Sequence, residues 1–209
     1  MPNAIPDPGN DVAARIAQRT LADREAGYSA EVRRLLDAGR EVMRRNGAGK
    51  RATVAEIIGA AGLSNEAFYR HFPSKDALVA AILEDGTERL RGYLTHQMAK
   101  DGEPAARVRR WVEGVLSQAV DEEVAATTLA VLWNAGGAGD RLGSSAASAP
   151  LAELLVEPFT ALGSAQPGLH AALAGHALVG LLSDHLWAGT RPSPAEIDAV
   201  AEAILRSVR

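Results

Sequence analysis

Residues 64–71 of the sequence are rich in side chains that recognise nucleic acid. Asparagine can make two hydrogen bonds to adenine, and arginine can do the same with guanine or bind a phosphate. Tyrosine and histidine commonly donate hydrogen bonds to the sugar–phosphate backbone. We expect one exposed face to carry Ser64, Asn65, Glu66, Ala67, Tyr69, Arg70 and His71. These types and their spacing suit a surface that reads DNA.

The flanking residues supply a frame for this face. Thr53 and Glu56 have the spacing of a capping box, which predicts a helix over 53–61. Gly62 breaks that helix, and Ser64 can cap a second short helix that ends near residue 72. A small shared core is predicted from Ile57, Ala61, Leu63, Phe68 and Phe72. Two short helices joined by such a turn have the size of a helix-turn-helix, whose second helix enters the major groove.

The charge is distributed unevenly along the chain. The 209 residues have a net charge of −4, which by itself argues against a polyanionic partner. Residues 28–75, however, carry nine Lys and Arg against five Asp and Glu, whereas residues 76–209 carry ten against seventeen. A basic N-terminal part on an acidic body is typical of a nucleic-acid reader with a second function.

The rest of the chain is predicted to be helical. Apolar residues at helical spacing predict helices over 11–25, ended by Gly27, and over 29–46. Ser74 and Asp76 open a long amphipathic helix, and Pro104 opens another. Further helices are predicted over 122–134, 151–162 with a kink at Pro158, 169–187 and 194–208. The Gly-, Ser- and Ala-rich stretch 136–149 is predicted to be a mobile loop. The fold class is therefore all-α.

Several other classes of protein find no support in the sequence. The absence of cysteine excludes disulfides, thiolate metal sites and a cysteine nucleophile. The glycine-containing stretches 47–51 and 137–143 lack the spacing of a P-loop and a dinucleotide loop, and no catalytic motif occurs. No two histidines have a metal-binding spacing, so neither metal nor cofactor is expected. No signal peptide or membrane-spanning segment is expected, which makes the cytoplasm the default location.

The motifs around the helix-turn-helix are similar to those of a known family. Thr53-Val54-Ala55-Glu56-Ile57, then Ala61-Gly62-Leu63-Ser64, then Phe68-Tyr69-Arg70-His71-Phe72-Pro73-Ser74-Lys75-Asp76-Ala77-Leu78 resembles the TetR/AcrR transcriptional regulators over residues 30–80. The resemblance implies an extension over 1–27, a three-helix helix-turn-helix DNA-binding domain over 28–75, and a larger helical ligand-binding and dimerisation domain over 76–209. It also implies that a ligand in the second domain changes the separation of the two DNA-reading helices.

Carried over by position, the family's DNA contacts fall on named residues of this chain. Thr53, Tyr69, His71 and Lys75 match backbone contacts. Ser64, Asn65, Glu66 and Ala67 match positions that face bases, with Tyr69 beside them, and Arg70 could serve either purpose. Three departures from the family pattern matter. Ala67 replaces a frequent hydroxyl residue, Glu66 is acidic, and Ile58-Gly59 replaces alanine and a polar residue.

A ligand site is expected between the body helices. The candidates for its lining are the large or polar side chains on those helices: Tyr93, Met98, Trp111, Gln118, Trp133, Asn134, Phe159 and His176. For each of them a place in the core or a satisfied buried hydrogen bond is the competing interpretation.

The sequence therefore predicts a dimeric regulator, with repression as the expected mode, that binds a palindromic DNA operator and is released by a small-molecule effector. The apolar helix 169–187 and the final helix 194–208 are expected to pair with their mates in a homodimer. The alternatives are a helical small-molecule-binding protein or enzyme without operator binding, and a structural interaction module. The extension with Arg15, Arg19 and Arg24 could be a basic arm, could pack on the domain, or could be disordered. The sequence specifies neither the effector nor the operator.

Overall fold

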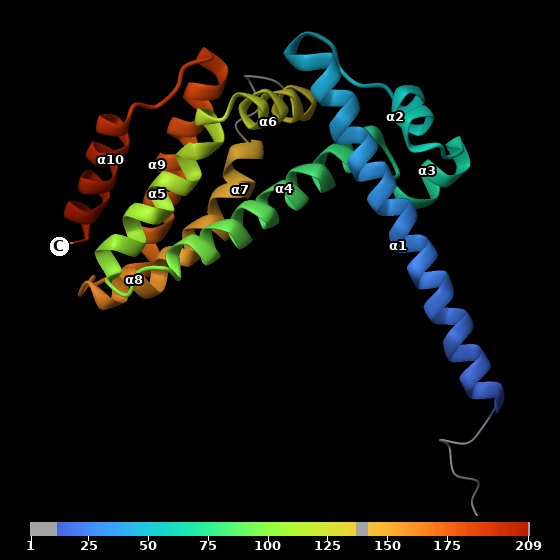
Figure 1. The fold of residues 1–209 in the computed structure, drawn as a ribbon, viewed down its shortest axis with the longest axis horizontal. Coiled ribbons are helices and arrows are strands. Elements are labelled where there is room, and N and C mark those ends of the chain that lie inside the picture. Colours follow the sequence, from blue (N-terminus) through green and yellow to red (C-terminus); the bar gives the residue numbers. More distant parts are fainter. Residues whose placement is uncertain (1–11, 137–141, 209) are drawn as a thin grey trace, which may run out of the picture.

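The protein is described here by a computed structural model that covers residues 12–136 and 142–208 (Figure 1). Within these residues every regular element is a helix, which confirms the predicted all-α fold. The N-terminal part contains α1 (Val12–Asn46), a 3-10 turn (Gly47–Gly49), α2 (Val54–Ala61) and α3 (Asn65–His71). The long α4 (Lys75–Met98) leads from it into the body.

The body is a bundle of further helices. It contains α5 (Pro104–Val120), α6 (Glu122–Ala135), α7 (Leu142–Ala152), a 3-10 turn (Glu153–Leu155), α8 (Val156–Ala161), α9 (Pro167–Ala188) and α10 (Pro194–Ser207). Figure 1 shows α6 reaching from this bundle to α1. No helix in the described ranges is long and apolar enough to cross a membrane.

Two apolar cores hold the molecule together. The smaller core joins α1, α2, α3 and the first half of α4, and it also includes Ala130 and Val131 of α6. The predicted shared core lies in it, since Ile57 and Phe68 are fully buried and Leu63 packs at its edge. The larger core joins the body helices around Trp111 and Phe159. Because α4 and α6 contribute to both regions, they connect the N-terminal part to the body.

The prediction that Gly27 ends a helix is wrong. α1 runs without interruption through Gly27, and the side chains of residues 15–27 are exposed (Figure 1). A glycine inside a helix costs only about 1 kcal/mol relative to alanine, and its neighbours here are good helix formers. Neither proline nor a capping contact stops the helix at this point. Residues 12–27 of the extension therefore form a helix that projects away from the domain.

The predicted loop over 136–149 is also wrong in part, because α7 begins at Leu142; residues 137–141 lie outside the described part of the chain. α7 is held by close packing on α9. A Cβ atom added to Gly175 would lie 2.6 Å from the Cβ of Ala152 and 3.0 Å from the carbonyl oxygen of Ser148. This glycine lets the two backbones approach closely, and tertiary packing overrides the loop-like composition.

The kink predicted at Pro158 lies elsewhere. The α-helix is interrupted at the 3-10 turn Glu153–Leu155, and Pro158 lies in the first turn of α8. The first turn of a helix leaves its N–H groups without partners inside the helix, so proline costs little there.

Candidate nucleic-acid interface and pocket

The two helices of the helix-turn-helix begin and end where the sequence predicts. The Thr53 hydroxyl accepts a hydrogen bond from the N–H of Glu56 (3.2 Å), and the Glu56 carboxylate accepts one from the N–H of Thr53 (2.9 Å). Ser64 caps α3 by accepting from the N–H of Ala67 (3.1 Å). These contacts confirm the predicted caps of α2 and α3.

The turn between the helices depends on one glycine and one arginine. Gly62 has φ 61° and ψ 38°, a left-handed conformation that glycine adopts without strain. Arg34 of α1 donates hydrogen bonds to the carbonyl oxygens of Ala61 (2.5 Å) and Gly62 (3.1 Å). α1 therefore fixes the end of α2, and with it the direction in which α3 leaves.

Thr53 has limited capacity to bind a phosphate in this structure. Its side chain is exposed, as a contact to the DNA backbone would require. Its hydroxyl proton, however, is donated to the Glu56 carboxylate (2.9 Å). A phosphate oxygen accepts but does not donate, so a side-chain contact would require Thr53 to give up this bond.

Glu56 gives the capping box a dependence on pH. The hydrogen bond from Lys50, followed by those from the backbone and side chain of Thr53, lowers the pKa of Glu56 from 4.5 to about 2. A carboxyl whose pKa is lower in the folded state stabilises the fold above its unfolded pKa. That stabilisation is lost as the pH falls from 4.5 towards 2.

We expect Glu56→Gln to unfold at a lower urea concentration than the native chain at pH 7, because the glutamine lacks the charge. The difference between the two proteins should shrink as the pH falls from 4.5 to about 2. Urea titrations at several pH values measure this. Lys50→Met, which removes the largest cause of the shift, should show the same trend. If the difference in unfolding between Glu56→Gln and the native chain persists unchanged at the lowest pH, the charge of Glu56 is not its cause.

The exposed face of α3 carries most of the residues predicted to face bases. Asn65, Glu66 and Tyr69 are exposed, as is the capping Ser64, and Tyr69 has 52% of its surface exposed. Arg70 is half-exposed and lies 3.4 Å from Glu31 of α1 and 3.7 Å from Glu66. These two carboxylates hold the guanidinium beside the face.

Ala67 does not lie on this face. It is 5% exposed and is turned towards the interior of the helix-turn-helix. Ala67 therefore has almost no exposed surface with which to contact a base, and the prediction that it faces bases is wrong. The prediction assigned only the phenylalanines of this segment to the core, whereas a helix of seven residues turns a wider side to its core.

His71 is also placed differently from its predicted role at the DNA backbone. Its side chain is fully buried, with its ring against Tyr28 of α1 (centroids 4.2 Å apart) and its Nε2 atom donating to the Glu31 carboxylate (2.7 Å). The His71 hydrogen bond, assisted by the charge of Arg70, lowers the pKa of Glu31. His71 thus fastens the end of α3 to α1. Glu31 lies 40 residues away in the sequence, so no local pattern indicates this pairing.

Lys75 lies where a phosphate contact is possible. It is the first residue of α4, directly after the capping Ser74, and its side chain is partly exposed. Within the described residues it makes no hydrogen bond or ion pair. Its ammonium group therefore needs no rearrangement to meet a phosphate.

The second candidate site is a cavity of about 1170 Å³ in the body. Its walls come from α4, α6, α7 and α9, and Gln118 of α5 and Arg40 of α1 complete them. Most of the lining is aliphatic, including Val79, Leu83 and Leu182. Small-molecule sites in proteins are typically concave and mostly apolar, with a few polar groups.

Two of the eight residues proposed for a ligand site line this cavity, Tyr93 and Gln118. Met98 and Phe159 belong to the body core. Trp111 is fully buried and donates to the carbonyl oxygen of Leu151 (2.9 Å), and the indole ring of Trp133 packs on Trp187. His176 is hydrogen bonded to Ser148 (2.8 Å). Met98, Trp111 and Phe159 are therefore core residues and His176 has a hydrogen-bond partner, whereas the buried Nε1 atom of Trp133 has no partner within the described residues.

Asn134 is the eighth of these residues, and it connects the body to the helix-turn-helix. It is 2% exposed; its Oδ1 atom accepts from the N–H of Ala52 (2.8 Å), and its Nδ2 atom donates to the carbonyl oxygen of Ala130 (2.9 Å). Because a buried polar group without a partner is costly, this pair keeps α6 in register with the segment that leads into α2.

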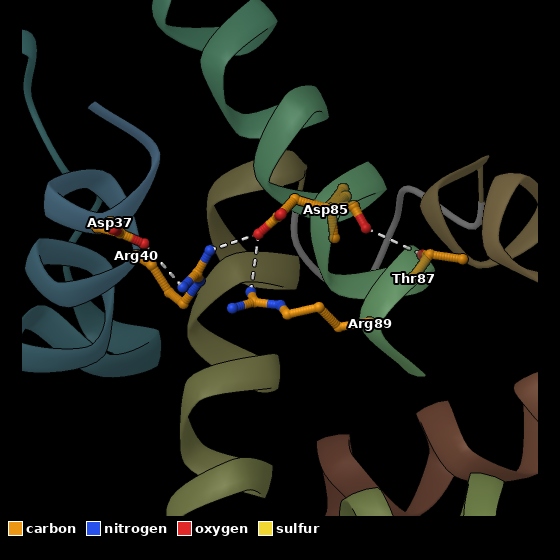
Figure 2. Close-up of polar contacts among 6 residues, drawn as sticks. Asp37, Arg40, Asp85, Thr87 and Arg89 are labelled. Atoms are coloured by element: carbon orange, nitrogen blue, oxygen red, sulfur yellow. Dashed lines mark hydrogen bonds and ion pairs between the residues drawn. The ribbon is translucent and has the colours of Figure 1, made fainter. Parts of the chain in front are cut away.

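Sequence reasoning missed an ion-pair network at the edge of the cavity. Figure 2 shows Arg40 of α1 and Arg89 of α4 reaching the same carboxylate, that of Asp85 on α4. The distances to its Oδ2 atom are 2.6 Å from Arg40 and 2.9 Å from Arg89, and Arg40 also lies 3.3 Å from Asp37. Arg40 and Arg89 both line the cavity. A side chain of the N-terminal part therefore forms part of the cavity wall.

Within the described residues no group of three or more His, Asp or Glu side chains is arranged to hold a metal ion. The two candidate sites are therefore an exposed helical face suited to DNA and an apolar cavity.

Comparisons with known proteins bear on the helix-turn-helix region and on the fold of the chain. A family model described as bacterial regulatory proteins, tetR family, matches residues 35–82. A search of curated proteins finds no match. Among solved structures, RolR in complex with resorcinol has a TM-score of 0.63 at 16% identity, covering 87% of this chain and 89% of that chain.

Two further solved structures share the fold. A TetR-family transcriptional regulator from Mesorhizobium loti has a TM-score of 0.61 at 17% identity, covering 87% of this chain and 96% of that one. FadR from Bacillus subtilis, in complex with stearoyl-CoA, has a TM-score of 0.57 at 16% identity, covering 84% and 96%. Residues 35–82 therefore match the tetR-family model, and the chain as a whole shares the fold of these solved structures.

Proposed function

We propose that this chain binds a palindromic DNA operator as a homodimer and is released from it by a small molecule held in the body cavity, so that it acts as a repressor. The observation that carries the proposal is the pairing of two sites in one chain. An exposed face of α3 presents Asn65 and Tyr69, and the wall of an apolar cavity includes Arg40 of α1. We assign DNA reading to residues 28–75 and effector binding and dimerisation to residues 76–209.

Two exposed leucines near the N-terminal end of α9 support the proposed dimer through α9 and α10. Leu169 and Leu173 of α9 are 52% and 58% exposed and lie one helical turn apart. Exposed leucines on one helix face are costly in water, which supports burial against a second copy. In a two-fold dimer the two α3 helices would then read half-sites about one helical turn of DNA apart.

The network around Asp85 supports a route from the cavity to the DNA. A ligand can shift an equilibrium only if it binds one conformation more tightly than the other. Arg40 belongs to α1, which also holds α2 through Arg34 and α3 through Glu31. A ligand that displaces the cavity wall at Arg40 would therefore act on the element that orients the recognition helix. The ligands of RolR and FadR show that this fold accommodates small molecules in those proteins.

Selection from random DNA tests the operator part of the proposal. The full-length protein should enrich a sequence with two-fold symmetry, and its affinity should fall steeply with salt because several phosphates are neutralised. A metabolite screen should then find compounds that release the protein from the enriched DNA. Without enrichment and without salt-dependent affinity, tight binding of a metabolite would favour a helical small-molecule-binding protein instead.

Asp85→Asn should reduce the response to an effector found in that screen. The neutral amide no longer holds Arg40 and Arg89 together, so α1 and α4 can move independently. Coupling between two sites is typically 5- to 150-fold in affinity, and we expect the ratio of operator affinities without and with effector to fall at least fivefold, to about 20% of its native value or less. Gel-shift titrations measure both affinities.

Asp101→Asn is the matched control, because Asp101 pairs with Arg110 at 2.9 Å in the body. It should leave the response unchanged. An equal loss in both variants would mean that the Asp85 network has no special role in the response.

A further inference from the structure

The polar groups inside the cavity carry no charge. Gln118 of α5, Thr128 of α6 and Ser183 of α9 line it, and each is partly buried. Within the described part of the chain none of the three side chains has a hydrogen-bond partner. An amide and two hydroxyls on three neighbouring helices thus remain free to bind a ligand.

Of the other uncharged polar side chains of the wall, Tyr93 is 44% exposed to solvent, and the two threonines Thr87 and Thr127 are already hydrogen bonded. The hydroxyl of Thr87 donates to the carbonyl oxygen of Leu83 (2.9 Å; Figure 2), and that of Thr127 donates to the carbonyl oxygen of Glu123 (2.8 Å). Their protons are used within their own helices. Thr127 and Thr128 therefore present the same chemical group in one cavity wall with different capacity to donate to a ligand.

The charged residues of the wall lie at its rim. Six of them are exposed to solvent: Asp76, Glu84, Glu88, Arg89, Asp121 and Glu123. The seventh, Arg40, is partly buried but is paired with Asp85 and Asp37. Five carboxylates against two arginines give this rim a negative balance, which disfavours the entry of an anion.

The interior offers no charged partner to a buried ion. The deeper wall is made of aliphatic side chains such as Ile82, Val179 and Leu186. Burying a charge without a counter-charge costs far more than burying a neutral polar group that finds a hydrogen bond. A charged ligand group would therefore have to stay at the rim, whereas hydroxyl or carbonyl oxygens can be satisfied inside.

We infer that the cavity takes an uncharged, largely apolar molecule whose hydroxyl or carbonyl oxygens form hydrogen bonds with Gln118, Thr128 and Ser183. The inference rests on the proposed function, since it specifies the chemical class of the effector. The cavity volume of about 1170 Å³ leaves room for molecules larger than a single aromatic ring.

Four naphthalene probes of one ring system test the charge of the ligand. They are 2-naphthol, 2-naphthoate, 2-naphthylmethylammonium and naphthalene, titrated against the full-length protein at pH 7 without DNA and followed by calorimetry. We expect 2-naphthol to bind at least tenfold more tightly than either ion. Equal or tighter binding of the carboxylate or the ammonium compound would overturn the inference.

Substitutions of similar shape test the hydrogen bonds. The triple variant Gln118→Leu, Thr128→Val and Ser183→Ala should reduce the preference for 2-naphthol over naphthalene about tenfold, because naphthalene makes no such bonds. Thr127→Val, whose hydroxyl is already occupied, should leave that preference unchanged. An unchanged preference in the triple variant would contradict the assignment of the three residues.

The inferred ligand class and the proposed operator binding can each fail without the other. The charge comparison uses the native protein, so it decides the ligand class even if the triple variant does not fold. It also involves no DNA. Preference for a charged probe would therefore contradict the inferred ligand class without affecting the proposal of operator binding. Failure of the operator selection would contradict operator binding without changing the measured preference among the probes.

Discussion

Replacing Tyr69 with alanine should weaken operator binding about 30-fold or more and leave the free energy of unfolding nearly unchanged. The tyrosine lies on the outer face of α3 with 52% of its surface exposed, so its removal opens no cavity in the core. In a dimer the contact is lost twice. A good base or backbone contact is worth about 1–3 kcal/mol, which sets the size of the expected loss.

Gel-shift titration against the selected operator measures the affinity, and urea unfolding measures the stability. Tyr93→Ala is a matched control, because Tyr93 is a tyrosine of similar exposure that lies on α4 beside the cavity. Without effector it should bind the operator like the native chain. If Tyr69→Ala binds as tightly as the native protein, the exposed face of α3 is not the DNA-reading surface.

Replacing Phe68 with alanine should reduce the stability of the fold as well as operator binding. Phe68 is the residue before Tyr69, but it is fully buried in the smaller core, near Phe72 (ring centroids 6.1 Å apart). Truncating a buried phenylalanine typically costs about 3–5 kcal/mol, through lost burial and the cavity left behind. We expect a loss of that size in the free energy of unfolding, with operator binding lost because α3 is no longer held in place.

Chemical denaturation measures this loss. Phe68→Leu, which retains most of the apolar volume, should cost substantially less and keep part of the operator binding. A loss below about 1 kcal/mol for the alanine variant would mean that the core around Phe68 contributes little to stability.

Much of the local structure is predictable because its causes lie close together in the sequence. The capping box of Thr53 and Glu56 and the caps at Ser64, Ser74 and Ser193 each join residues three positions apart. The residues that make such contacts are near neighbours, so their spacing can be recognised in the sequence. For the same reason the motif around Tyr69 was enough to predict the helix-turn-helix, although Ala67 and His71 of the predicted exposed face are buried.

The errors concern residues whose environment comes from distant segments. α7 forms in a loop-like sequence because Gly175 lets α9 approach it closely. His71 is buried because Tyr28 and Glu31 of α1 cover it. Composition and spacing contain neither fact, since both depend on how helices far apart in the sequence pack against each other.

By itself, then, the sequence determined the helical class, the ends of the capped helices and the presence of a DNA-reading motif. Local hydrogen bonds and periodicity fix these features. Only the tertiary structure decided which candidates line a cavity, leaving Tyr93 and Gln118 and adding Thr128 and Ser183. It also brought Arg40 to Asp85 across 45 residues of sequence. A cavity wall and an ion pair between helices exist only after packing has chosen which side of each helix is buried.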